Sequence, residues 1–86
     1  MWKLIDYFDV WGNAEDGYEV NDVMKYDINL SDNPTNEEIF KALQNMNYLK
    51  SNLIEDITFD WTSDIWCELI MTDNGYPLGR VVKEVF

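Results

Sequence analysis

The stretch YEVNDVMKYDINLS, residues 18–31, decides the fold because apolar and polar side chains alternate along it. Its even positions are apolar except for Asp22, and its odd positions are polar except for Val23. The apolar set is Tyr18, Val20, Met24, Tyr26, Ile28 and Leu30. A period of two residues is typical of a strand with one buried face. We therefore predict a half-buried β-strand.

The preceding segment, residues 2–11, alternates in the same way, and the loop GNAEDG, residues 12–17, separates the two. We predict an antiparallel hairpin in which Val10 faces Tyr18, so that both sets of even positions lie on one side. Four acids then face each other in two pairs, Asp6 with Asp22 and Asp9 with Glu19. Because like charges directly across a ladder repel, we expect a bulge to shift one of them or another group to offset the repulsion.

The stretch SDNPTNEEIFKALQNMNYL, residues 31–49, has the pattern of a helix. Thr35 and Glu38 form a capping box at its start, and Asn47 suits a left-handed end. Its apolar stripe has the spacing i, i+4, i+7 and consists of Ile39, Leu43 and Met46.

Residues 56–72, DITFDWTSDIWCELIMT, predict a second hairpin with a turn at residues 62–64 that sets Trp61 opposite Ile65. The Asn-Gly turn in TDNGYPLG then leads to a last strand, RVVKEVF, residues 80–86. The predicted fold class is α+β, with residues 1–86 forming a single domain. It is an antiparallel five-stranded sheet with one helix packed on one face, in the order ββαβββ.

The charge balance limits the partners. Among 86 residues there are 17 acids and 6 bases, for a net charge of −11. Such a field repels nucleic acids and anionic membranes and attracts basic protein surfaces. The alternative is that the acidity keeps an aromatic-rich small protein soluble. The first residues resemble neither a signal peptide nor a membrane span, so we expect a cytoplasmic protein.

Catalytic chemistry has little support in the sequence, and we predict that the protein is not an enzyme. The chain has no histidine, which removes the commonest general base and metal ligand. Its one cysteine, Cys67, lies in a predicted strand and reads as a buried, inert thiol. Asp6 and Asp22 are the best pair for acid–base work, but a chain of this size hardly encloses a cleft.

Metal binding also lacks a motif, and we expect no metal and no cofactor. Aligning Gly17 with the glycine of a calcium-binding EF-hand loop puts Gly12 and Val23 where acids are required. An irregular divalent-cation site formed by Glu15, Asp16 and Glu19 stays open as an alternative.

One helix covers one face of a five-stranded sheet, so the opposite face should be open. It would show five apolar side chains among acids: Tyr7, Trp11, Val23, Trp66 and Ile70. Aromatic anchors inside a polar rim are typical of a protein-binding patch. The alternative is that the loop at residues 12–17 folds over this face and makes a second small core.

The acids follow the strands in two predicted arrays, one with Asp9, Glu15, Asp16 and Glu19, the other with Asp56, Asp60, Asp64 and Glu68. Carboxylates two residues apart on a strand are separated by about 6.6 Å. Carboxylates with this spacing can take the place of DNA phosphates in a basic channel that binds nucleic acid. With Tyr7, Trp11 and Trp66 they form the predicted partner-binding surface, and the expected partner is a basic, nucleic-acid-binding protein. A homo-oligomeric assembly protein, such as a homodimer, is the other class left open.

Three stretches, YFDVWGN with DGYEVND, TNEEI and GYPLGR, resemble small uncharacterised proteins encoded by phages and prophages. The resemblance covers most of the chain and implies a phage accessory protein that acts in the host cytoplasm. Many such proteins, anti-CRISPR and anti-restriction inhibitors among them, are short, acidic and non-enzymatic. The family carries no assigned site, so no residue roles transfer.

Overall fold

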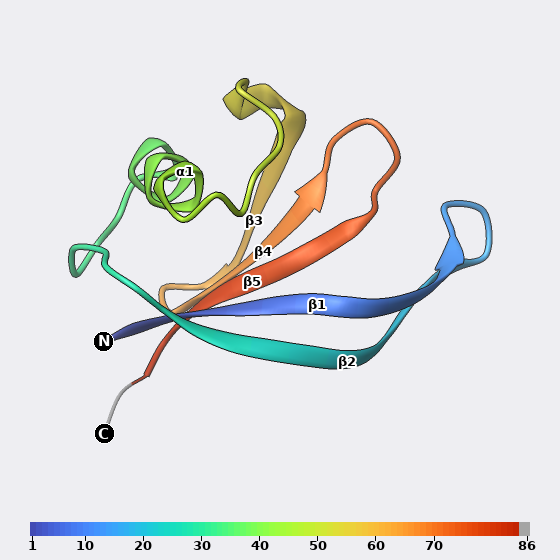
Figure 1. Cartoon of the computed structure of the whole chain (residues 1–86), viewed down its shortest axis with the longest axis horizontal. Helices are drawn as coiled ribbons and strands as arrows, with labels where there is room; N and C mark the ends of the chain where they lie inside the picture. Colours follow the sequence, from blue (N-terminus) through green and yellow to red (C-terminus); the bar gives the residue numbers. More distant parts are fainter. Residues whose placement is uncertain (85–86) are drawn as a thin grey trace.

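Residues 1–84, which the structure describes, form a five-stranded antiparallel sheet and one α-helix in a computed structural model (Figure 1). The elements are β1 (Trp2–Asn13), β2 (Gly17–Ile28), α1 (Asn36–Asn45), a short 3-10 helix η1 (Ile54–Asp56), β3 (Ile57–Ser63), β4 (Trp66–Met71) and β5 (Pro77–Lys83). Across the sheet the strands run β2-β1-β5-β4-β3. This confirms the α+β class and the order ββαβββ. The last strand begins at Pro77, earlier than predicted, and residues 85 and 86 lie outside the described part.

The core lies between α1 and one face of the sheet, which we call the helix side. Its buried residues are Trp2, Leu4, Ile28, Ile39, Phe40, Leu43, Ile57, Cys67, Leu69 and Val81. Within the described residues no helix is long and apolar enough to cross a membrane. Cys67 is fully buried, as predicted, and burial raises its pKa to about 12.

The ends of α1 follow the sequence signals. The hydroxyl of Thr35 accepts a hydrogen bond from the backbone N–H of Glu38 (3.1 Å), and Asn47 has φ +58°. The Glu38 carboxylate, however, accepts hydrogen bonds from the backbone N–H and the hydroxyl of Ser31, which fixes the chain entering the helix. Of the predicted apolar stripe, Ile39 and Leu43 are buried, whereas Met46, just beyond the end of α1, is 37% exposed; Phe40, which flanks the stripe in the sequence, is buried.

The register of the first hairpin differs from the prediction by two residues. Val10 lies opposite Val20, not Tyr18, and Asp6 lies opposite Met24, not Asp22. The ladder continues to Asn13 and Gly17, which leaves a turn of three residues. Asp16 stabilises this turn by donating its backbone N–H to the side-chain oxygen of Asn13 (2.7 Å).

The second hairpin shows the same kind of difference. Trp61 lies opposite Cys67, not Ile65, and an irregularity between Trp61 and Ser63 shortens the turn. Ile65 is 43% exposed in that turn. Ile57, Cys67 and Leu69 face the core in either register, because a shift by two residues keeps each side chain on its side of the sheet.

The β1–β2 hairpin extends beyond the rest of the sheet (Figure 1). Residues 2–6 of β1 pair with β5, whereas residues 7–13 pair with β2 alone among the described residues. We call the projecting part, residues 7–23, the arm. Near its tip, the hydroxyl of Tyr18 contacts the carbonyl of Asn74 (3.5 Å), and its ring lies edge-on to Tyr76 at 5.4 Å. Tyr18 therefore connects the arm to the β4–β5 turn.

Candidate functional site

Two carboxylates face each other within the arm. Asp9 pairs with Asp22, and the register shifts on both sides of this pair, because the ladder skips Phe8 of β1 on one side and Asn21 of β2 on the other. The predicted acid pairs, Asp6 with Asp22 and Asp9 with Glu19, are therefore wrong. The repulsion is offset locally, since Asp9 accepts a hydrogen bond from the indole N–H of Trp11 (2.7 Å) and Asp22 accepts one from the backbone N–H of Val23 (2.9 Å).

The outer half of the arm is uniformly acidic. Residues 9–22 include five acids and no base: Asp9, Glu15, Asp16, Glu19 and Asp22. Trp11 lies directly opposite Glu19, and its side chain is 65% exposed. Glu15, Asp16 and Glu19 are exposed. The arm thus brings together the predicted residues of the first acidic array and the exposed Trp11 ring; Phe8, at its base, is 54% exposed as well.

On the face of the sheet opposite the helix side, four residues form a connected cluster that we call the Arg80 cluster. The hydroxyl of Tyr7 donates to Glu68 Oε2 (2.7 Å) and accepts from Arg80 Nη1 (3.0 Å). The indole N–H of Trp66 donates to Glu68 Oε1 (2.8 Å). The Arg80 guanidinium lies 4.5 Å from the centre of the Trp66 ring and 5.4 Å from that of Tyr7, within the range of cation–π attraction.

This cluster corrects the predicted partner-binding surface. Tyr7 is 8% exposed and not an open anchor, and burial raises its pKa to about 12. Trp66 and Glu68 are half-buried, and their polar groups bind each other and Tyr7. The loop alternative is also wrong, because residues 12–17 are exposed and Arg80 covers the rings instead.

The second predicted acidic array is not one continuous row. Asp60 does face Glu68 across β3 and β4. Asp56, however, accepts a hydrogen bond from the Ser51 hydroxyl at one end of β3, and Asp64 lies in the turn at the other end. The same sheet face also carries cations in ion pairs, Lys3 with Asp27 and Lys25 with Glu84. The coherent acidic region is consequently the arm.

No cation site is assembled at the arm. Among residues 1–84, no group of three or more His, Cys, Asp or Glu side chains is close enough to hold a metal ion. The divalent-cation alternative at Glu15, Asp16 and Glu19 therefore has no geometric support.

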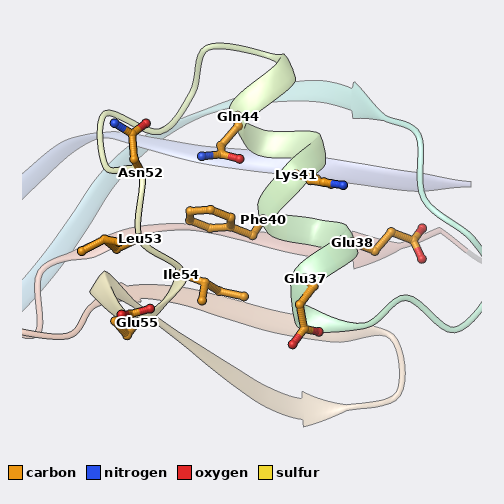
Figure 2. Close-up of a pocket in the computed structure, with 9 residues that line it drawn as sticks. All are labelled: Glu37, Glu38, Phe40, Lys41, Gln44, Asn52, Leu53, Ile54 and Glu55. Atoms are coloured by element: carbon orange, nitrogen blue, oxygen red, sulfur yellow. The ribbon is translucent and has the colours of Figure 1, made fainter.

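A surface groove of about 640 Å³ lies between α1 and the segment that leads into β3 (Figure 2). Phe40, Leu53 and Ile54 form its apolar part, and Glu37 and Glu55 lie at its rim. Leu53 is 54% exposed. Sequence reasoning missed this groove because residues 49–56 have no periodic pattern that places them beside the helix.

The structure also leaves apolar residues of β2 uncovered. They were predicted to lie on the buried face, yet Val20 is 38%, Met24 47% and Tyr26 39% exposed. The reason is the position of α1, which lies away from most of the β1–β2 hairpin (Figure 1). Within β2, Ile28 is the buried residue. The prediction of a strand was correct, and the prediction that it is half-buried was wrong.

No family model matches the chain, and comparisons with curated proteins and with solved structures give no match either.

Proposed function

We propose that the protein is a non-enzymatic, acidic protein-binding module whose arm contacts a basic surface of its partner. The observation that carries this proposal is the arm itself, a projecting two-stranded ribbon with five acids, no base and an exposed Trp11. The ladder fixes the backbone at Asp9, Glu19 and Asp22, and the hydrogen bond from Asp16 to Asn13 holds the short turn that carries Glu15 and Asp16. The backbone that presents these acids is therefore ordered before a partner binds.

The chemistry of the arm favours arginine-rich and lysine-rich surfaces. An exposed indole ring attracts a guanidinium through its π face, and neighbouring carboxylates bind the same group through charge-assisted hydrogen bonds. Trp11, Asp9 and Glu19 offer both features within one patch. A surface of this kind is typical of proteins that hold nucleic-acid backbones.

The finer form of the proposal is that the arm occupies such a surface in place of DNA, as an inhibitor would. The resemblance to phage accessory proteins supports an inhibitor of a host defence protein, of the anti-CRISPR or anti-restriction kind. In that case the protein acts in the host cytoplasm.

The test compares two variants of equal charge. The arm variant carries Asp9→Asn, Glu15→Gln, Asp16→Asn and Glu19→Gln. The control carries Asp32→Asn, Glu37→Gln, Glu55→Gln and Asp73→Asn, four exposed acids outside the arm. Both variants change the net charge from −11 to −7, because each neutralises four acids. Wild type and variants are immobilised and titrated with purified DNA-binding proteins, with and without competing DNA.

We expect the arm variant to bind at least about tenfold more weakly than the wild type and the control to stay within about threefold. Binding of the wild type should fall steeply between about 50 and 300 mM salt, because exposed charges are screened over the Debye length. Equal losses in the two variants would show that net charge, not the arm, governs binding, and would overturn the proposal.

A further inference from the structure

We infer that β2 binds an extended segment of the partner as a sixth strand of the sheet, and that basic and apolar residues alternate in this segment. This inference rests on the proposed function and deepens it by naming the form that the basic partner takes at the arm.

The backbone of β2 is accessible along one side. β2 is an edge strand of 12 residues, and within residues 1–84 it pairs with β1 alone. Ten of its residues are exposed, Tyr18 is half-buried and Ile28 is buried. The outward N–H and C=O groups of an edge strand pair readily with an added strand.

On the helix side, β2 presents exposed apolar side chains that apolar residues of the added strand would cover. Tyr26 and Met24 lie opposite Leu4 and Asp6 of β1, whose side chains point toward the helix side. Tyr26 also lines a hollow of about 250 Å³ that is bordered by Met46 at the end of α1. An added strand would lie about 4.8 Å from β2, so its helix-side residues would cover this apolar surface.

The charge of β2 selects basic residues in the same strand. β2 contains three acids, Glu19, Asp22 and Asp27, and one base, Lys25. Asp27 is in an ion pair with Lys3, and Lys25 is in one with Glu84. Among residues 1–84, Glu19 and Asp22 are therefore left without a basic partner. An added strand with lysine or arginine at alternate positions would supply this missing positive charge.

A second copy of this chain fits the same edge poorly. Pairing β2 with β2 would bring three acids from each strand together, and each copy carries a net charge of −11. Like charges across a ladder are unfavourable, and here the copy would contribute one lysine that is already paired. Charge thus favours a basic segment over self-association.

The other edge strand, β3, lacks the apolar surface. Its Phe59 and Trp61 are partly buried against the core, and Trp61 donates its indole N–H to Asn36 (2.9 Å). The remaining face carries Thr58, Asp60 and Thr62. An added strand would find little to cover there, which distinguishes the two edges.

The experiment uses the full chain and a labelled, end-capped peptide of about nine residues, long enough to span most of β2, in which Lys or Arg alternates with Val or Ile. A peptide with the same composition in blocks removes the alternation. Two further versions of the alternating peptide are N-methylated at every second amide. In one version the methyl groups lie along one edge of the peptide strand, and in the other version they lie along the opposite edge. Binding is measured by fluorescence anisotropy at low salt.

We expect the alternating peptide to bind at least about tenfold more tightly than the block peptide. N-methylation along one edge should weaken binding at least about tenfold, whereas methylation along the other should leave it within about threefold, because one edge of an added strand makes the ladder bonds. Equal effects of the two methylations would overturn strand addition.

Matched protein variants locate the site. Met24→Lys and Leu53→Lys each place one lysine at an exposed apolar position, 47% and 54% exposed in the wild type. Met24→Lys should weaken binding of the alternating peptide at least about fivefold and Leu53→Lys less than about twofold. Circular dichroism of both variants verifies that they fold.

The outcomes separate this inference from the proposed function. If the two unmethylated peptides bind equally and lose binding with salt, strand addition is wrong while the charge-driven function stands. If the alternating peptide binds through Met24 but the arm variant binds it as well as the wild type, the proposed function is wrong while strand addition stands. If sedimentation shows a dimer that the peptide fails to dissociate, a second copy occupies β2 and the inference is overturned.

Discussion

Replacing Tyr7 by phenylalanine tests whether the Arg80 cluster holds the open face of the sheet together. The change removes one oxygen atom, and with it the hydrogen bonds to Glu68 (2.7 Å) and from Arg80 (3.0 Å). Glu68 keeps the indole N–H of Trp66, and Arg80 keeps both aromatic rings, since phenylalanine retains the ring of residue 7. The loss is therefore confined to the hydroxyl group.

The expected magnitude follows from the charge of the two partners. Hydrogen bonds to charged groups contribute about 1.5–3 kcal/mol each, and Glu68 and Arg80 are only half-buried, which reduces the loss. We expect Tyr7→Phe to lower the free energy of unfolding by about 2–3 kcal/mol. For a domain of this size that corresponds to a fall in Tm of roughly 10–20 °C.

The matched control is Tyr26→Phe. The hydroxyl of Tyr26 contacts the thioether of Met24 at 3.5 Å, and the residue is 39% exposed. The same chemical change there should alter stability by less than about 0.5 kcal/mol. Urea unfolding followed by tryptophan fluorescence measures both variants, since Trp66 belongs to the cluster.

The pH dependence gives a second test. Burial and the hydrogen bond to Glu68 raise the pKa of Tyr7 from 10.0 to about 12. The contribution of the protonated hydroxyl to stability is thus complete below pH 10 and is lost as the pH rises from 10 through 12. The difference in stability between wild type and Tyr7→Phe should shrink over this interval. A difference that stays constant there, or a Tyr7→Phe variant as stable as Tyr26→Phe, would refute the reasoning.

Two further predictions concern the core. Gly79→Ala should lower the free energy of unfolding by at least about 3 kcal/mol in the same urea assay, because its Cβ would overlap the carbonyl oxygen of Ile5 and lie 2.9 Å from the Tyr48 hydroxyl. Gly75→Ala is the control, with φ +70° but no atom within 4 Å, and should lose only about 1–2 kcal/mol; equal losses would contradict the steric argument. Cys67, fully buried with a pKa raised to about 12, should react with a maleimide at pH 8 at least about a hundredfold more slowly in the native protein than in urea. Comparable rates in the two states would place the thiol at the surface.

Short-range patterns in the sequence determined the class of fold and the side of each strand. The alternation in residues 18–30 gave a strand, Thr35 and Asn47 marked the two ends of the helix, and the apolar positions of the second hairpin face the core. These signals depend on residues within one turn or one strand of each other. They hold without knowledge of the rest of the chain.

Register was decided by tertiary structure. In both hairpins the observed pairing differs from the predicted one by two residues, Val10 with Val20 and Trp61 with Cys67. A shift by two residues keeps side chains on the same face, so hydrophobic alternation cannot detect it. The turn at Asn13 and the bulge beside Asp9 decide the pairing.

The candidate site, too, was predicted in part from the sequence and in part decided by tertiary structure. The acids of the arm and Trp11 are neighbours in sequence, so their proximity was predicted from the sequence alone. Burial of Tyr7 depends on Arg80, which is 73 residues away, and exposure of Met24 depends on where α1 crosses the sheet. A strand's period tells which side chains share a face, whereas contacts between distant segments decide whether that face is covered.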